Sequence, residues 1–110
     1  MAYWHKNLAA GGWKRLLLIE QLGNIGSEVF RASRWQNENE ENFKIAVYKA
    51  LELFDLTLDD SRWKGRLQEI IRIKDVFCDT ALNEGKVYKT DWESLNQYFF
   101  QFAWAAREDC

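Results

Sequence analysis

The stretch LIEQLGNIGSEVFRA, residues 18–32, decides the fold of this chain. Its apolar side chains recur at intervals of four and three residues, at Leu18, Leu22, Ile25, Val29 and Ala32. Residues with this spacing lie along one face of an α-helix and leave the opposite face polar. We therefore predict an amphipathic helix over about residues 13–35, preceded by a short N-terminal arm, residues 1–12.

Two more segments repeat this spacing of apolar residues, each after a polar connecting stretch. Acidic residues in the stretch 36–42 favour the positive end of a second helix, which we predict over about residues 40–58. The sequence Asp-Asp-Ser at 59–61 then interrupts the apolar pattern and offers side-chain oxygens that cap helix starts. A third helix is predicted over about residues 61–82.

The fourth helix has the clearest predicted start. Gly85 is expected to end the third helix, and Thr90 with Glu93 has the pattern of a capping box, which satisfies two backbone donors. A fourth helix is therefore predicted over about residues 91–108. Because short joints connect the four segments, we expect an all-α, antiparallel up-and-down four-helix bundle.

The composition supports one globular domain over residues 1–110. Hydrophobic residues make up 47% of the chain and charged residues 29%, which differs from the composition of disordered chains. No apolar run approaches the roughly 18 residues of a membrane span. Cys78 and Cys110 give no framework of disulfides, so we expect a cytoplasmic protein.

No set of residues carries a recognisable catalytic, cofactor or metal site. The single histidine, His5, supplies neither the paired Glu-x-x-His motifs of a di-iron bundle nor a usual zinc site. Cys78 falls on the predicted core face of the third helix, so we interpret it as a buried structural thiol. We expect a non-enzymatic protein without a cofactor, while a ligand-binding or enzymatic bundle built on the polar helix stripes is a third hypothesis.

Small residues lie inside the first predicted helix. Gly23 and Gly26 each cost a helix roughly 1 kcal/mol relative to Ala. A close crossing of two helices compensates for this cost, because small side chains let the backbones approach. We therefore predict helix packing at Gly23, Gly26 and Ser27.

The sequence YFFQFAWAA, from Tyr98 to Ala106, makes the fourth helix apolar on nearly every side. In a monomeric bundle Phe100 and Trp104 would stay exposed, and such a patch usually marks association. The alternative is intramolecular cover by aromatic residues near the N-terminus: Tyr3, Trp4 and Trp13. We predict a homo-oligomer or a protein partner, with these interface candidates: Tyr98, Phe100, Trp104, Trp4 and Trp13.

The formal net charge of −2 provides no overall basic field for nucleic acid. Basic residues are nevertheless enriched in the first and third helical segments. An accessory nucleic-acid-binding role is therefore the alternative hypothesis. Its predicted basic face consists of Lys14, Arg15, Arg31, Arg34, Arg62, Lys64 and Arg66.

Three stretches, residues 20–29 (EQLGNIGSEV), 50–60 (ALELFDLTLDD) and 98–107, resemble a group of small uncharacterised prokaryotic helical proteins. The resemblance covers nearly the whole chain; it implies a helical bundle, but no activity and no functional residue. The predicted architecture is also similar to four-helix proteins encoded in ribosomal RNA intervening sequences or beside retroelement reverse transcriptases. Those proteins form ring-like oligomers and are commonly basic, whereas this chain is acidic.

Overall fold

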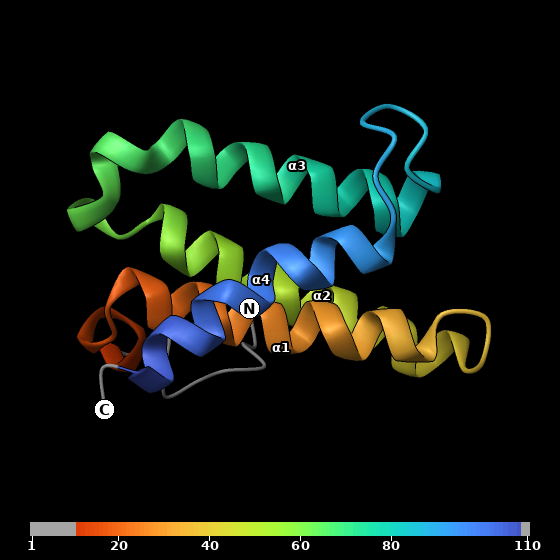
Figure 1. Ribbon diagram of the computed structural model, residues 1–110, viewed down its shortest axis with the longest axis horizontal. Coiled ribbons are helices and arrows are strands. Elements are labelled where there is room, and N and C mark those ends of the chain that lie inside the picture. Colours follow the sequence, from red (N-terminus) through yellow and green to blue (C-terminus); the bar gives the residue numbers. More distant parts are fainter. Residues whose placement is uncertain (1–10, 109–110) are drawn as a thin grey trace.

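The computed structural model describes residues 11–108, and within this range the chain forms four α-helices and no β-strand. The helices are α1 (Leu18–Trp35), α2 (Glu40–Leu58), α3 (Leu67–Asn83) and α4 (Trp92–Glu108). Figure 1 shows that successive helices run in opposite directions along the long axis of the molecule. The predicted antiparallel four-helix bundle is confirmed. α1 packs mainly against α2 and α4, and α3 packs on α2.

Apolar side chains from all four helices meet in one core. Phe54 of α2 contacts Phe77 of α3 and Phe99 of α4, with ring centroids 5.8 and 6.1 Å apart. All three rings are buried, as are Ile25 and Val29 from the apolar stripe of α1. Aromatic pairs at this spacing contribute about 0.5–1.5 kcal/mol each beyond the area that they bury.

The predicted start of the first helix at residue 13 is wrong. Trp13–Arg15 form a short 3₁₀ helix, η2, and the backbone is extended at Leu16 before α1 begins at Leu18. In a continuous helix Trp13 would lie seven residues before Glu20, on the polar face. Trp13 is instead 1% exposed. The interruption of the helix at Leu16 allows this side chain to point into the core.

The third helix also begins later than predicted. Ser61–Arg66 form a 3₁₀ helix, η3, in which Trp63 has non-helical backbone angles, and α3 begins only at Leu67. The indole N–H of Trp63 donates a hydrogen bond of 3.0 Å to the Gln21 side chain of α1. This contact with a distant residue bends the start of the helix.

The predicted capping box of the fourth helix is wrong as well. The side chain of Asp91, not Thr90, accepts the hydrogen bond from the Ser94 amide, at 2.8 Å. Gly85 follows the end of α3 with a φ of 73°. A Cβ at this position would collide with the carbonyl oxygen of Thr90, so the turn requires glycine.

Buried polar side chains join η2, α1, α2 and η3 at one end of the bundle. The Trp13 indole N–H donates to Thr57 Oγ1 at 2.9 Å, and the Gln21 amide donates to the Trp13 carbonyl at 2.9 Å and to Asp60 at 3.2 Å. Arg62 pairs with Asp60 at 2.7 Å. Every one of these groups is satisfied within the cluster, which we call the polar cluster, so its role is structural.

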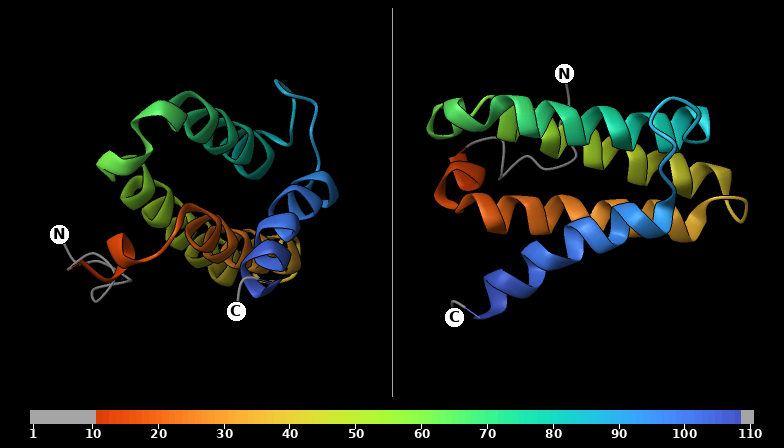
Figure 2. Two further views of the ribbon diagram at one scale, coloured as in Figure 1. Left: turned by 60° about the vertical axis from the view of Figure 1, so that its left-hand side comes forward. Right: turned by 45° about the horizontal axis from the view of Figure 1, so that its top comes forward.

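α4 crosses α1 at the two glycines of α1. A Cβ built on Gly26 would lie 2.6 Å from Phe99 Cβ, and one on Gly23 would lie 3.4 Å from Ala103 Cα. The hydroxyl of Ser27 donates to the Gly23 carbonyl at 3.3 Å. Beyond this crossing, the C-terminal half of α4 diverges from the other helices, as Figure 2 shows.

The two glycines predict opposite effects of the same substitution. Gly26→Ala should lower the free energy of unfolding by about 1–3 kcal/mol, because the new methyl group overlaps Phe99 and forces α4 away. Gly23→Ala makes only an ordinary contact and gains up to about 1 kcal/mol in helix propensity. Urea unfolding of both variants measures the difference. Equal effects would contradict the close approach at Gly26.

The ion pair in the polar cluster predicts a loss of stability in acid. Hydrogen bonds from the Arg62 side chain lower the pKa of Asp60 from 3.8 to about 2. Burial of the carboxyl group opposes this shift, and hydrogen bonds from the Arg62 amide and the Gln21 side chain add to it. Because the folded pKa is the lower one, the stabilisation is complete above about pH 4 and is lost as the pH falls toward 2. It amounts to at most about 2 kcal/mol, since the Arg62 side chain is 38% exposed and is partly screened.

Urea unfolding at several pH values, with Asp60→Asn as control, measures this contribution. The wild type should lose its advantage over the variant across this pH window. Backbone hydrogen bonds also lower the pKa values of Asp79 and Asp91. Because both proteins contain these two residues, the difference in stability between them isolates the contribution of Asp60. A pH-independent difference would contradict the assignment.

Candidate functional site

A groove lies between α1 and α4 beside their crossing. Its volume is about 1200 Å³, more than the 300–1,000 Å³ of typical small-molecule pockets. Most of its lining is apolar and aromatic, with side chains contributed by both helices: Phe30 and Trp35 from α1, and Trp92, Phe100 and Trp104 from α4. We call this feature the α1/α4 groove.

Two aromatic side chains of α4 project into this groove and remain exposed. Phe100 is 65% exposed and Trp104 is 55% exposed. They lie one helical turn apart, and their rings stack with centroids 6.3 Å apart and an interplanar angle of 28°. On the opposite wall, Phe30 is 50% exposed and Trp35 is 39% exposed. Contiguous exposed apolar surface of this kind usually marks a site of association.

Polar groups border the groove. Arg31 pairs with Glu28 at 2.7 Å, and the guanidinium of Arg34 lies over the Phe30 ring, 5.9 Å from its centroid. The Asn96 amide of α4 donates to the Ser33 hydroxyl of α1 at 3.1 Å. Aromatic side chains accompanied by arginine and other polar groups are typical of protein interfaces.

The predicted interface residues do not all lie in the groove. Phe100 and Trp104 do. Tyr98 lies elsewhere on α4, half-buried, with its ring against Phe99 and Phe102, and burial raises the pKa of its hydroxyl. Trp13 is buried against Thr57, which corrects its assignment as an interface candidate. Tyr3 and Trp4 lie outside the described residues.

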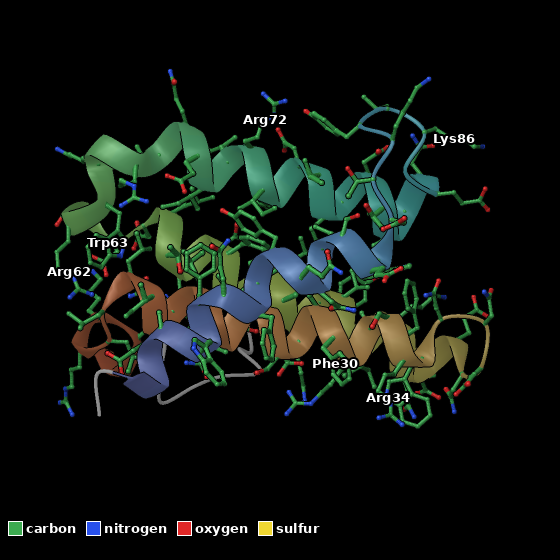
Figure 3. All side chains as sticks on the ribbon, viewed as in Figure 1. Phe30, Arg34, Arg62, Trp63, Arg72 and Lys86 are labelled. Carbon is green, nitrogen blue, oxygen red and sulfur yellow. The ribbon has the colours of Figure 1, made fainter. Side chains whose placement is uncertain are left out.

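The sequence prediction missed the α1 wall of the groove. Phe30 directly follows Val29 of the apolar stripe in the sequence. On the helix surface it lies one turn before Arg34, and therefore on the side of α1 that we interpreted as polar. Trp35 ends the same helix. A large aromatic residue within a polar stripe was the available signal. Figure 3 shows Phe30 and Arg34 on the outer side of α1.

The seven predicted basic residues do not form one face. Arg31 and Arg34 border the α1/α4 groove, whereas η2 and η3 carry the other five: Lys14, Arg15, Arg62, Lys64 and Arg66. Figure 3 shows Arg34 and Arg62 toward opposite ends of the bundle. The two 3₁₀ helices are joined where Arg62 donates to the Leu16 carbonyl at 2.7 Å. The single predicted face is therefore corrected to two separate groups.

The polar helix stripes disperse into separate contacts. Asp55 of α2 pairs with Lys74 of α3 at 2.8 Å, and Arg72 lies over the Tyr88 ring. Over residues 11–108 no three His, Cys, Asp or Glu side chains gather as metal ligands. Burial raises the pKa of the Cys78 thiol, which disfavours the reactive thiolate.

Comparison with protein-family models, curated proteins and solved structures finds no match to this chain. In the part of the chain that the structure describes, no helix combines the length and apolar character needed to cross a bilayer.

Proposed function

We propose that this chain is a non-enzymatic interaction module that binds a protein surface through the α1/α4 groove. The observation that carries the proposal is the stacked, exposed pair of Phe100 and Trp104 on the groove wall. Large aromatic side chains dominate binding energy when a partner buries them. The shape of the site agrees, because an open groove suits a polypeptide better than a small molecule.

The size of the exposed aromatic surface indicates a moderate affinity. Four aromatic side chains of roughly 200 Å² each, about half exposed, leave on the order of 400 Å² to be buried. At about 25 cal/mol per Å² this burial supplies on the order of 10 kcal/mol. Association itself costs roughly 4–15 kcal/mol. At the low end of this cost about 6 kcal/mol remain, so we expect a dissociation constant of roughly tens of micromolar or weaker.

Replacing Phe100 and Trp104 together by Ser should remove the binding surface and keep the fold. Both side chains are more than half exposed, so helicity by circular dichroism should be unchanged and solubility should rise. Anilinonaphthalene sulfonate, an aromatic dye that binds exposed apolar surface, reports the open groove. Its fluorescence with dilute protein should fall severalfold in the double variant.

Tyr48→Ser is the matched control, because Tyr48 is 56% exposed on α2 and does not line the groove. This variant should leave the dye fluorescence unchanged. Equal dye fluorescence in the wild type and the Phe100/Trp104 variant would contradict the proposed site. Loss of helicity in that variant would contradict the surface assignment.

A second candidate function rests on the hydrogen bond between Arg62 and the Leu16 carbonyl. This bond brings η2 and η3 together, and with them the five basic residues of that end. Such a group can contact the phosphates of a nucleic acid. Asp60 and Glu69 pair with Arg62 and Arg66, which lowers the local positive charge and makes this the weaker candidate.

Nucleic-acid binding at this end predicts a steep salt dependence. Five phosphate contacts would weaken single-strand binding about 100-fold between roughly 50 and 200 mM salt. The combined Arg15→Glu and Lys64→Glu substitution should abolish it, whereas Arg34→Glu, at the groove, should not. Fluorescence anisotropy with labelled oligonucleotides measures both effects. No binding at low salt would eliminate this candidate.

A further inference from the structure

We infer that the partner in the α1/α4 groove is a second copy of this chain, with the two α4 helices packed antiparallel about a two-fold axis at Phe100. This inference rests on the proposed function and names the partner for that site.

The first argument is the long uncharged stretch within α4. From residue 94 to residue 106 the sequence contains no charged residue. The groove side of the helix presents Glu93, Gln97, Phe100 and Trp104 at spacings of four, three and four residues. In a two-fold interface this face meets itself, so any charge near its centre would face a like charge. An uncharged centre rich in aromatic residues avoids that repulsion.

The second argument is the sign of the charges that end this stretch. The two copies of α4 run antiparallel about Phe100. A residue that lies n positions before Phe100 in one copy is therefore level with the residue that lies n positions after Phe100 in the other copy. Glu93 lies seven residues before Phe100 and Arg107 lies seven residues after it. Position 93 of one copy is then level with position 107 of the other, and the two residues have opposite charge. The symmetry repeats this pair at both ends.

The third argument is the room beside α4 and the area that it offers. The C-terminal half of α4 diverges from the rest of the bundle (Figure 2), so a second helix can approach it. A standard interface buries roughly 800 Å² on each partner. The exposed aromatic side chains provide on the order of half of this area. Polar residues of the groove lining, such as Gln97 and Arg34, supply the remainder.

The charges of the groove also favour a second copy over a strongly charged partner. Arg31 is paired with Glu28 within α1. The other charged residues of the lining, Arg34 and Glu93, have opposite signs. The groove therefore carries no excess charge that would select an acidic or a basic segment.

Reversing the terminal charges tests this arrangement in the full chain. Sedimentation equilibrium from about 1 µM to 1 mM should give the wild type a mass approaching twice 13.1 kDa. Glu93→Lys and Arg107→Glu should each raise the dissociation constant about tenfold or more. The combined Glu93→Lys and Arg107→Glu variant should return to near the wild-type value.

Rescue in the double variant is diagnostic of pairing between copies. Glu93→Lys places a cation near the N-terminus of α4 and Arg107→Glu places an anion near its C-terminus, so both substitutions oppose the helix dipole. Rescue therefore cannot arise within a single helix. Glu41→Lys, on the exposed first turn of α2, makes the same charge change as Glu93→Lys and should leave the dissociation constant unchanged.

Several results would overturn the inference. A wild-type monomer across the whole range excludes the second copy. A dimer that is insensitive to the Phe100/Trp104 double Ser variant, or single charge reversals that the double variant does not rescue, exclude this interface and register. A wild-type monomer whose dye fluorescence still depends on Phe100 and Trp104 removes only the second copy and leaves the proposed function standing. Dye fluorescence independent of both residues overturns the proposed function itself.

Discussion

The contact between Gly26 and Phe99 is the constraint on which the rest of the arrangement depends. Because glycine has no side chain, the Phe99 ring lies directly against the backbone of α1, and from there it reaches Phe54 in the core. Successive residues of an α-helix differ in direction by about 100°. Burying Phe99 at the crossing therefore turns Phe100 toward the groove, and Trp104 follows it one turn later.

The two ends of the bundle use their polar groups differently. In the polar cluster, Trp13, Gln21, Thr57 and Asp60 are all buried and satisfy one another. Such a cluster fixes the positions of η2 and η3 and has no capacity left for a ligand. At the α1/α4 groove the lining is mostly apolar and includes aromatic side chains that are at least half exposed: Phe30, Phe100 and Trp104. This difference is the physical reason for assigning structure to one end and binding to the other.

The sequence predicts the helices where local periodicity decides them. The predicted second helix, 40–58, agrees with α2, and the predicted fourth helix begins one residue before α4. The starts of the first and third helices were mispredicted because tertiary hydrogen bonds determine them. Trp13 bonds to Thr57, 44 residues away, and Trp63 bonds to Gln21, 42 residues away. No local pattern reports such contacts.

The candidate site was predictable to a similar extent. The apolar run of α4 identified Phe100 and Trp104, because a helix apolar on every side exceeds what three neighbours can cover. Predicting the α1 wall requires knowing which face of α1 remains uncovered by α4. This depends on the crossing at Gly26. The prediction of a single basic face was wrong for a related reason. Charge along the sequence does not show that Arg62 is paired with Asp60 or that α1 separates the groups.

The central claim is that the face containing Phe100 and Trp104 is a contact surface for a second copy. Fluorine NMR of protein with fluorinated tryptophan at all six tryptophan positions tests it directly, with Trp104 assigned through Trp104→Phe. The resonance of Trp104 should shift as the protein concentration rises and then saturate, while that of buried Trp13 stays constant. A Trp104 resonance that does not change up to about 1 mM would contradict the account.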